Sequence, residues 1–187
     1  MKKLLPIMLL LGTGLMSCTS CASNTLPVEV SSEPTSTALP TATPSASSDP
    51  VPVRTDVLVK KNKCEFTLPG LEWKSLPTCD EDNCPVAFVN KDETGLVVLL
   101  NEKFESSFDD YVLTMLREVK EAGATVDSVS EVTLSGHKFI LMDSSKDNVR
   151  VWLWVGLVGD QGYVLSCGGP VDNHDLCFDI AKSFKLN

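Results

Sequence analysis

The chain has 187 residues, of which 43% are hydrophobic, and it carries a formal net charge of −9 at pH 7. This length suits one ordinary domain with an additional segment. The acidic balance argues against nucleic acid and anionic head groups, which require an excess of lysine and arginine, so we expect no nucleic acid partner.

The first seventeen residues have the layout of a secretory signal peptide. Lys2 and Lys3 precede an apolar run over 4–11, which is too short to remain in a bilayer as a stable anchor. The following Leu15-Met16-Ser17-Cys18 resembles a bacterial lipobox, with an aliphatic residue three positions before the cysteine and a small residue just before it. This resemblance implies that Cys18 is lipidated and becomes the mature N-terminus. The alternative is an ordinary signal peptide whose cysteines later form disulfides.

Lipidation of Cys18 predicts a protein that is anchored to the membrane without spanning it. Thr19 follows the cysteine in place of aspartate, and in a bacterium with two membranes the lipoprotein resemblance then implies sorting to the outer membrane. Over 22–52, 18 of 31 residues are Ser, Thr or Pro, a composition that cannot bury enough apolar area to form a core. We therefore expect a signal peptide over 1–17, a lipidated N-terminus and disordered stalk over 18–52, and one extracytoplasmic domain of the cell envelope over 53–187.

The first half of this domain contains the alternating pattern of short strands. The predicted strands are 64–68, 71–76, 86–90 and 96–101. Pro69-Gly70 favours a turn between the first two, which makes the second a short partner of the first, and residues 91–95 favour a turn between the last two. These connections are too short for a parallel crossover, so we expect antiparallel pairing.

A helix is predicted from Phe108 to Ala122. Its apolar residues recur at helical spacing and form one continuous stripe: Phe108, Tyr111, Val112, Met115, Leu116, Val119 and Ala122. Ser107 followed by Asp110 resembles a capping box at the start, and Gly123 suits the position just past the end. We expect the stripe to pack on a sheet.

The second half predicts more strands and a closing helix. Strands are expected over 128–134, 137–143, 149–157 and 163–167, with a turn over 159–162, and a helix from Asp172 or Asn173. In the strand over 149–157, alternate aliphatic residues form one face that requires a core. The order of strands, helix, strands, helix predicts an α+β domain, an antiparallel β-sheet with helices packed against it.

This order of elements resembles the PsbP-like and DcrB-like group of small α/β/α-sandwich domains. The resemblance is carried by segments that span nearly all of 53–187: Phe66-Thr67-Leu68-Pro69 followed by Trp73, Ser107-Phe108 at the helix start, residues 132–139, the strand around Trp152, and Ser183-Phe184 at the end of the closing helix. The resemblance implies helices on both sheet faces and a non-enzymatic accessory or binding domain. It supplies no catalytic residues, and the cysteines depart from its pattern.

Seven cysteines in an exported protein indicate disulfides. The nearest pairs are Cys79 with Cys84 and Cys167 with Cys177, which leave Cys64 as a buried strand residue. An alternative joins Cys64 to Cys79 or Cys84, and the sequence does not choose between them. Near the last pair, His174 lies beside acidic residues in a set that could hold zinc, but we expect a disulfide there and no metal, because an oxidising compartment joins the two thiols.

Trp152 and Trp154 lie on the strand face opposite the aliphatic residues. If a helix covers that face they are core residues, as the sandwich resemblance favours. If no helix covers it, they form with Arg150 an exposed platform for a ligand or protein.

No spacing in the chain is typical of a catalytic centre. His137 and His174 are the only histidines, and no serine lies in a G-x-S-x-G setting. We therefore expect a non-enzymatic, lipid-anchored envelope protein without a cofactor. Its domain would serve as a binding or accessory module for an envelope protein partner. The alternative is a small-molecule or metal carrier that uses the Trp152/Trp154 face or the Cys167–Cys177 loop.

Overall fold

A computed structural model describes residues 56–187 except 62, 71, 77–84 and 171–172. The predicted signal peptide over 1–17, the predicted stalk over 18–52 with Cys18, and the predicted pair Cys79 and Cys84 lie outside the described residues. The described part is an α+β domain with a seven-stranded sheet, a three-stranded sheet and two helices. Within it, no helix is long and apolar enough to cross a membrane.

The seven-stranded sheet is antiparallel throughout, as the short connections predict. In spatial order its strands are β3 (Trp73–Leu76), β4 (Val86–Asn90), β5 (Leu96–Lys103), β9 (Gln161–Gly169), β8 (Val149–Val158), β7 (His137–Lys146) and β6 (Thr125–Leu134). The last four strands are longer than expected. The turn between β8 and β9 is accordingly shorter, since only Gly159 and Asp160 separate the two strands.

The three-stranded sheet contains β1 (Val57–Lys61), β2 (Cys64–Leu68) and β10 (Lys185–Leu186), with β2 in the middle. Strands β1 and β10 were not predicted from the sequence. The expectation that 71–76 would partner 64–68 is wrong, because β3 pairs with β4 in the large sheet. The partners of β2 are β1 and the last residues of the chain, a pairing that no local turn signal indicates.

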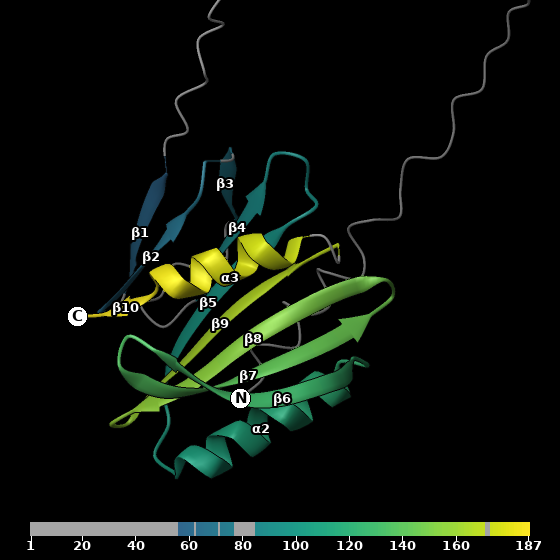
Figure 1. The fold of residues 1–187 in the computed structure, drawn as a ribbon. Coiled ribbons are helices and arrows are strands. Elements are labelled where there is room, and N and C mark those ends of the chain that lie inside the picture. Colours follow the sequence, from purple (N-terminus) through teal and green to yellow (C-terminus); the bar gives the residue numbers. More distant parts are fainter. Residues whose placement is uncertain (1–55, 62, 71, 77–84, 171–172) are drawn as a thin grey trace, which may run out of the picture. The chain divides into compact units, whose positions relative to one another are not determined.

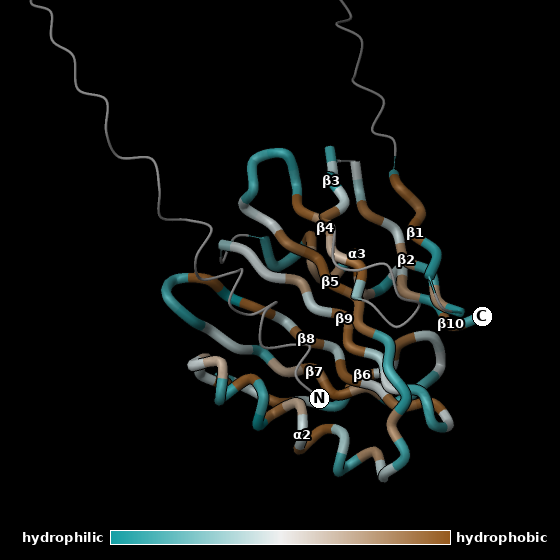
Figure 2. The backbone as a smooth tube through the Cα atoms, turned by 180° about the vertical axis from the view of Figure 1, so that it is seen from behind, coloured by the Kyte–Doolittle hydropathy of each residue, from teal (hydrophilic) through white to brown (hydrophobic). Residues whose placement is uncertain are grey.

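Helices α2 (Phe108–Glu121) and α3 (His174–Ser183) contribute to two separate hydrophobic clusters, one on each face of the large sheet (Figure 1). The alternation along β8 separates its side chains between the clusters, with Val151, Leu153 and Val155 on the α2 side and Trp152 and Trp154 on the α3 side. Figure 2 shows hydrophobic colour along strand β5, while α2 alternates between hydrophobic and hydrophilic segments. The predicted sandwich arrangement is therefore confirmed.

The ends of α2 follow their sequence signals. The Asp110 backbone N–H donates to Ser107 Oγ over 3.1 Å, and the Ser107 N–H donates to the Asp110 carboxylate over 3.4 Å, which completes the capping box. Gly123 follows the helix with φ of +80°, a left-handed conformation that suits glycine. Residues Tyr111, Met115 and Val119 of the stripe are buried.

Gly156 in β8 gives space to an aromatic ring on the α3 face. A Cβ atom at this position would lie 2.4 Å from the Phe139 ring, which in turn makes an edge contact with Phe184 at 5.9 Å between centroids. Phe139 and Phe184 are both buried, so the ring has little space in which to move.

We predict that Gly156→Ala lowers the free energy of unfolding by about 1–3 kcal/mol, because the added methyl overpacks the core against Phe139. Urea unfolding measures the change. In the double variant Gly156→Ala/Phe139→Leu the smaller side chain leaves space for the methyl, so the combined loss is smaller than the sum of the two single losses. Additive losses would contradict this contact.

Candidate functional site

A cavity of about 560 Å³ lies at one end of the large sheet, on the face that α3 packs against. We call it the end pocket. Its lining residues come from the large sheet, the β8–β9 turn and the C-terminal segment: Lys63, Asn101, His137, Val158, Asp160, Gln161, Tyr163, Leu186 and Asn187. The volume lies within the range of about 300–1,000 Å³ that is typical of small-molecule sites.

The end pocket lies just beyond the end of α3. Phe184 follows the helix and contacts the Tyr163 ring at 6.4 Å between centroids. On the same face of the sheet, the next row contains Gln161, which is in register with Val158. Because β10 then pairs with β2, the described part of the chain places no helix over this row.

Backbone contacts fix the C-terminal wall of the pocket. The Leu186 N–H donates to Ser135 Oγ over 2.9 Å, in the turn between β6 and β7. The Asn187 N–H donates to the Lys63 carbonyl over 2.6 Å. The wall is therefore held from two sides, by the large sheet and by the three-stranded sheet.

Asn101 lines the end pocket with a buried side chain that is only 6% exposed. Its Nδ2 group has no hydrogen-bond partner among the described residues. A buried donor of this kind costs about 1–3 kcal/mol when it stays unpaired, so natural proteins rarely keep one without a reason. Asn101 is thus the buried polar residue of this pocket whose side-chain amide nitrogen has no structural role among the described contacts.

Tyr163 lies opposite Asn101 on the neighbouring strand and is 5% exposed. Burial raises the pKa of its phenol, and the nearby Asn101 carboxamide partly opposes that rise. The two groups are therefore close, although their geometry does not satisfy a hydrogen bond. At neutral pH the phenol keeps its proton and can donate it to a ligand oxygen.

The mouth of the end pocket carries charge of both signs. Lys63, His137 and Asp160 line it with exposed side chains. The Asp160 carboxylate lies 3.9 Å from Lys103 Nζ, and this lysine is shared with Glu105, which lies 2.7 Å away. Lys63 has no carboxylate partner within ion-pair distance in the described part of the chain.

Trp152 and Trp154 are 1% and 2% exposed, which confirms the interpretation as core residues. Phe178 of α3 contacts both rings, with centroids at 6.3 and 5.4 Å. The alternative of an exposed aromatic platform is wrong, because α3 covers these rings. Arg150 donates two hydrogen bonds to the Asp143 carboxylate, which is largely buried, and it lies over the Trp152 ring at 5.4 Å. Arg150 therefore compensates an internal charge.

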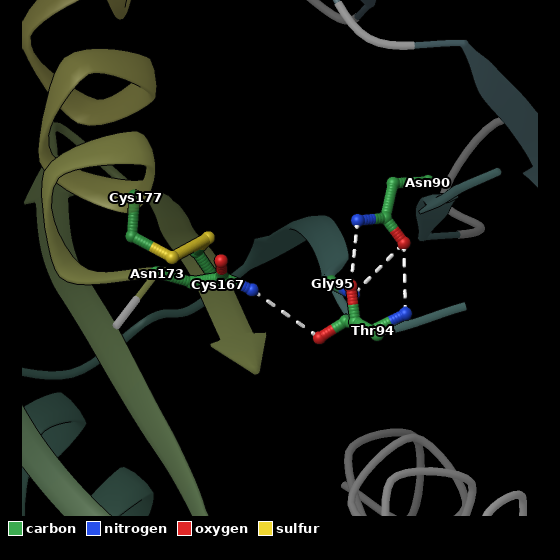
Figure 3. Close-up of a disulfide and its surroundings, with 6 residues drawn as sticks. All are labelled: Asn90, Thr94, Gly95, Cys167, Asn173 and Cys177. Atoms are coloured by element: carbon green, nitrogen blue, oxygen red, sulfur yellow. Dashed lines mark hydrogen bonds between the residues drawn. A yellow bond between two sulfur atoms is a disulfide. The ribbon is translucent and has the colours of Figure 1, made fainter. Parts of the chain in front are cut away.

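Cys167 and Cys177 form the predicted disulfide, which joins β9 to α3 (Figure 3). Both thiols are consumed, so the zinc alternative at this loop is wrong, and no group of three His, Cys, Asp or Glu in the described residues could hold a metal. His174 stacks on Phe178 at 4.1 Å between centroids. Cys64 is a buried free thiol whose pKa burial raises to about 11, so its alternative pairing with Cys79 or Cys84 is also wrong.

Asn90 provides a contrast to Asn101. It is equally buried, but both polar atoms of its side chain have hydrogen-bond partners. Its Oδ1 accepts from the Thr94 and Gly95 N–H groups at 2.9 and 3.0 Å, and its Nδ2 donates to Thr94 Oγ1 over 3.0 Å (Figure 3). Asn173, just before α3, donates to the Thr94 carbonyl over 3.4 Å. This network joins the β4–β5 turn to the start of α3 and serves structure.

Asn101 was not predicted as a site residue, although the sequence contains a signal for it. Asn101 continues the period-two series of Val97 and Leu99, which face the α3 cluster. A polar residue in a buried row of this kind requires an explanation. The pattern does not show that α3 ends before this row.

Comparison with solved structures supports the fold. The solution structure of cyanobacterial PsbP (CyanoP) from Synechocystis sp. PCC 6803 aligns with a TM-score of 0.55 and 12% identity, over 75% of this chain and 98% of that one. The domain has a PsbP-like fold. Two weaker likenesses are a Bacteroides thetaiotaomicron protein, with a TM-score of 0.48 and 17% identity over 67% of this chain and 45% of that one, and a Pseudomonas aeruginosa protein of unknown function, with 0.39 and 11% over 63% and 85%.

No protein family profile and no curated protein matches the sequence. At these identities the likeness to cyanobacterial PsbP concerns the fold alone.

We predict that Asn101→Leu leaves the free energy of unfolding unchanged or raises it by up to about 2 kcal/mol, because it removes a buried unpaired donor without a large change of volume. Asn90→Leu is the matched control. It loses three hydrogen bonds and should lower the free energy of unfolding by about 2–4 kcal/mol. Urea unfolding of both variants measures the difference, and equal losses would show that Asn101 is bonded in the folded protein.

We predict that the double variant Cys167→Ala/Cys177→Ala lowers the free energy of unfolding by about 2–3 kcal/mol. The reason is that the disulfide closes a short loop and so reduces the conformational entropy of the unfolded chain. Urea unfolding gives the magnitude, and non-reducing peptide mapping of the wild type identifies the pair. Cys64→Ala is the control that leaves all cross-links in place. A map that places Cys64 in a disulfide would contradict the pairing.

Proposed function

We propose that this protein is a non-enzymatic, lipid-anchored protein of the bacterial cell envelope, whose extracytoplasmic domain is a binding module. Its binding site is the end pocket. The observation that carries the proposal is the buried Nδ2 group of Asn101, which lines a cavity of ligand size and lacks a partner in the described part of the chain.

The chemistry of the end pocket suits recognition better than catalysis. Among the described residues, those that line it include no serine, threonine or cysteine. The raised pKa of Tyr163 keeps the phenol protonated at neutral pH, which favours a hydrogen-bond donor over a base or nucleophile. His174 does not line the end pocket. It lies at the other end of α3, where its ring stacks on Phe178.

The anchoring part of the proposal rests on the sequence. The lipobox-like segment that ends at Cys18 and the Ser/Thr/Pro-rich residues 22–52 support a tethered domain held away from the lipid surface. In a bacterium with two membranes the anchor would be in the outer membrane. A protein partner in the envelope stays a prediction.

Native mass spectrometry of the full-length protein, extracted from its own membrane, tests both parts. We expect added mass that corresponds to acyl chains and that is lost in Cys18→Ser. The control Cys21→Ser, which removes the other cysteine of this segment, should keep the added mass. We also expect a small organic ligand retained by the wild type and lost in Asn101→Leu. Wild-type protein without acyl mass would refute the anchor. A ligand retained equally by Asn101→Leu, or turnover of a substrate at enzyme-like rates, would refute the binding role of the pocket.

A further inference from the structure

We infer that the end pocket binds a small organic carboxylate with a short apolar body, and that the carboxylate oxygen accepts a hydrogen bond from Asn101 Nδ2. This inference rests on the proposed function, because it names the ligand class of the same site. It follows from the donors, the charge and the apolar walls of the pocket.

The buried end of the pocket calls for an acceptor. The unpaired atom of Asn101 is an amide nitrogen, which only donates. Tyr163 lies in register with it on β9, and its protonated phenol is a second donor close by. One ligand oxygen with two lone pairs can accept from both groups, whereas an ammonium group would leave both donors unpaired.

The mouth of the pocket offers one cation that can attract a carboxylate. Lys63 lines it with an exposed ammonium group that has no ion-pair partner in the residues described, while Lys103 is shared between Glu105 at 2.7 Å and Asp160 at 3.9 Å. A carboxylate bonded to an amide and steered by one lysine fits this balance. A phosphate carries more charge and typically takes several cationic donors, and Lys63 is the single lysine or arginine among the described lining residues.

The walls define the remainder of the ligand. Val158 and Leu186 line the pocket with aliphatic side chains, and the ring of Tyr163 adds an apolar surface. Burial of apolar ligand surface there contributes to affinity, and the carboxylate sets the orientation. Benzoate combines these features and has matched analogues of different charge.

The experiment uses the ¹⁵N-labelled full-length chain in mild detergent, and it follows the Asn101 side-chain amide signal during titration with benzoate, neutral benzamide or cationic benzamidine. We expect benzoate to shift this signal in a saturable manner. Benzamide should bind at least about tenfold more weakly and benzamidine not at all, because a hydrogen bond to a charged acceptor is stronger than one to a neutral acceptor.

Two variants locate the interaction. Asn101→Leu, which we expect to fold, should weaken benzoate binding about tenfold, followed by the shifts of neighbouring backbone amides. Lys63→Gln should reduce the preference for benzoate over benzamide. Lys74→Gln removes the same unit of charge on β3, at the opposite end of the sheet, and should leave that preference unchanged.

The outcomes separate the inference from the function on which it rests. Equal binding of benzamide and benzoate, or a benzoate affinity that Asn101→Leu leaves unchanged, overturns the carboxylate assignment. Absence of a saturable benzoate shift at Asn101 overturns it as well. In each case the retained ligand found by native mass spectrometry still decides whether the end pocket is a binding site.

Discussion

Both faces of the β8–β9 hairpin are buried, and the rest of the domain is arranged to cover them. Val151, Leu153 and Val155 require a cover on one side, and α2 supplies it. Trp152 and Trp154 require one on the other, and α3 supplies it together with β2 of the smaller sheet. A sheet that exposes neither face at its centre needs a layer on each side, which gives the sandwich its three layers.

The elements that could be predicted from the sequence are those whose signals are local. Helix α2 has its apolar stripe, capping box and terminal glycine within one short segment, and the hairpins have turn residues between their strands. β10 has no such signal, because it is two residues long and its partner β2 lies near the other end of the domain. The partner predicted for β3 was wrong for a similar reason, because the strand with which β3 pairs depends on contacts between residues far apart in the sequence.

The candidate site shows the same division. Periodicity placed Trp152 and Trp154 on one face but could not decide whether a helix covers them. Periodicity also did not identify the ion-pair partner of Arg150. That partner, Asp143, lies on the neighbouring strand β7 and is not adjacent to Arg150 in sequence. The disulfide between Cys167 and Cys177 was predictable from proximity. Asn101 was visible as a polar residue in a buried row, but its meaning depends on where α3 ends.

The position of the end pocket follows from the lengths of α3 and β9 and from the disulfide that joins them. Helix α3 has ten residues, and at about 1.5 Å per residue it spans roughly 15 Å. Strand β9 has nine residues, and at about 3.3 Å per residue it spans roughly 30 Å. The helix therefore cannot cover the whole strand. The disulfide fixes α3 near Cys167, and Phe184 reaches only as far as Tyr163, so the uncovered part falls at Gln161. A longer α3 from the same anchor would extend over Gln161 and fill the pocket. The short helix thus leaves this end of β9 open on the face that α3 covers elsewhere, next to the buried side chains of Asn101 and Tyr163.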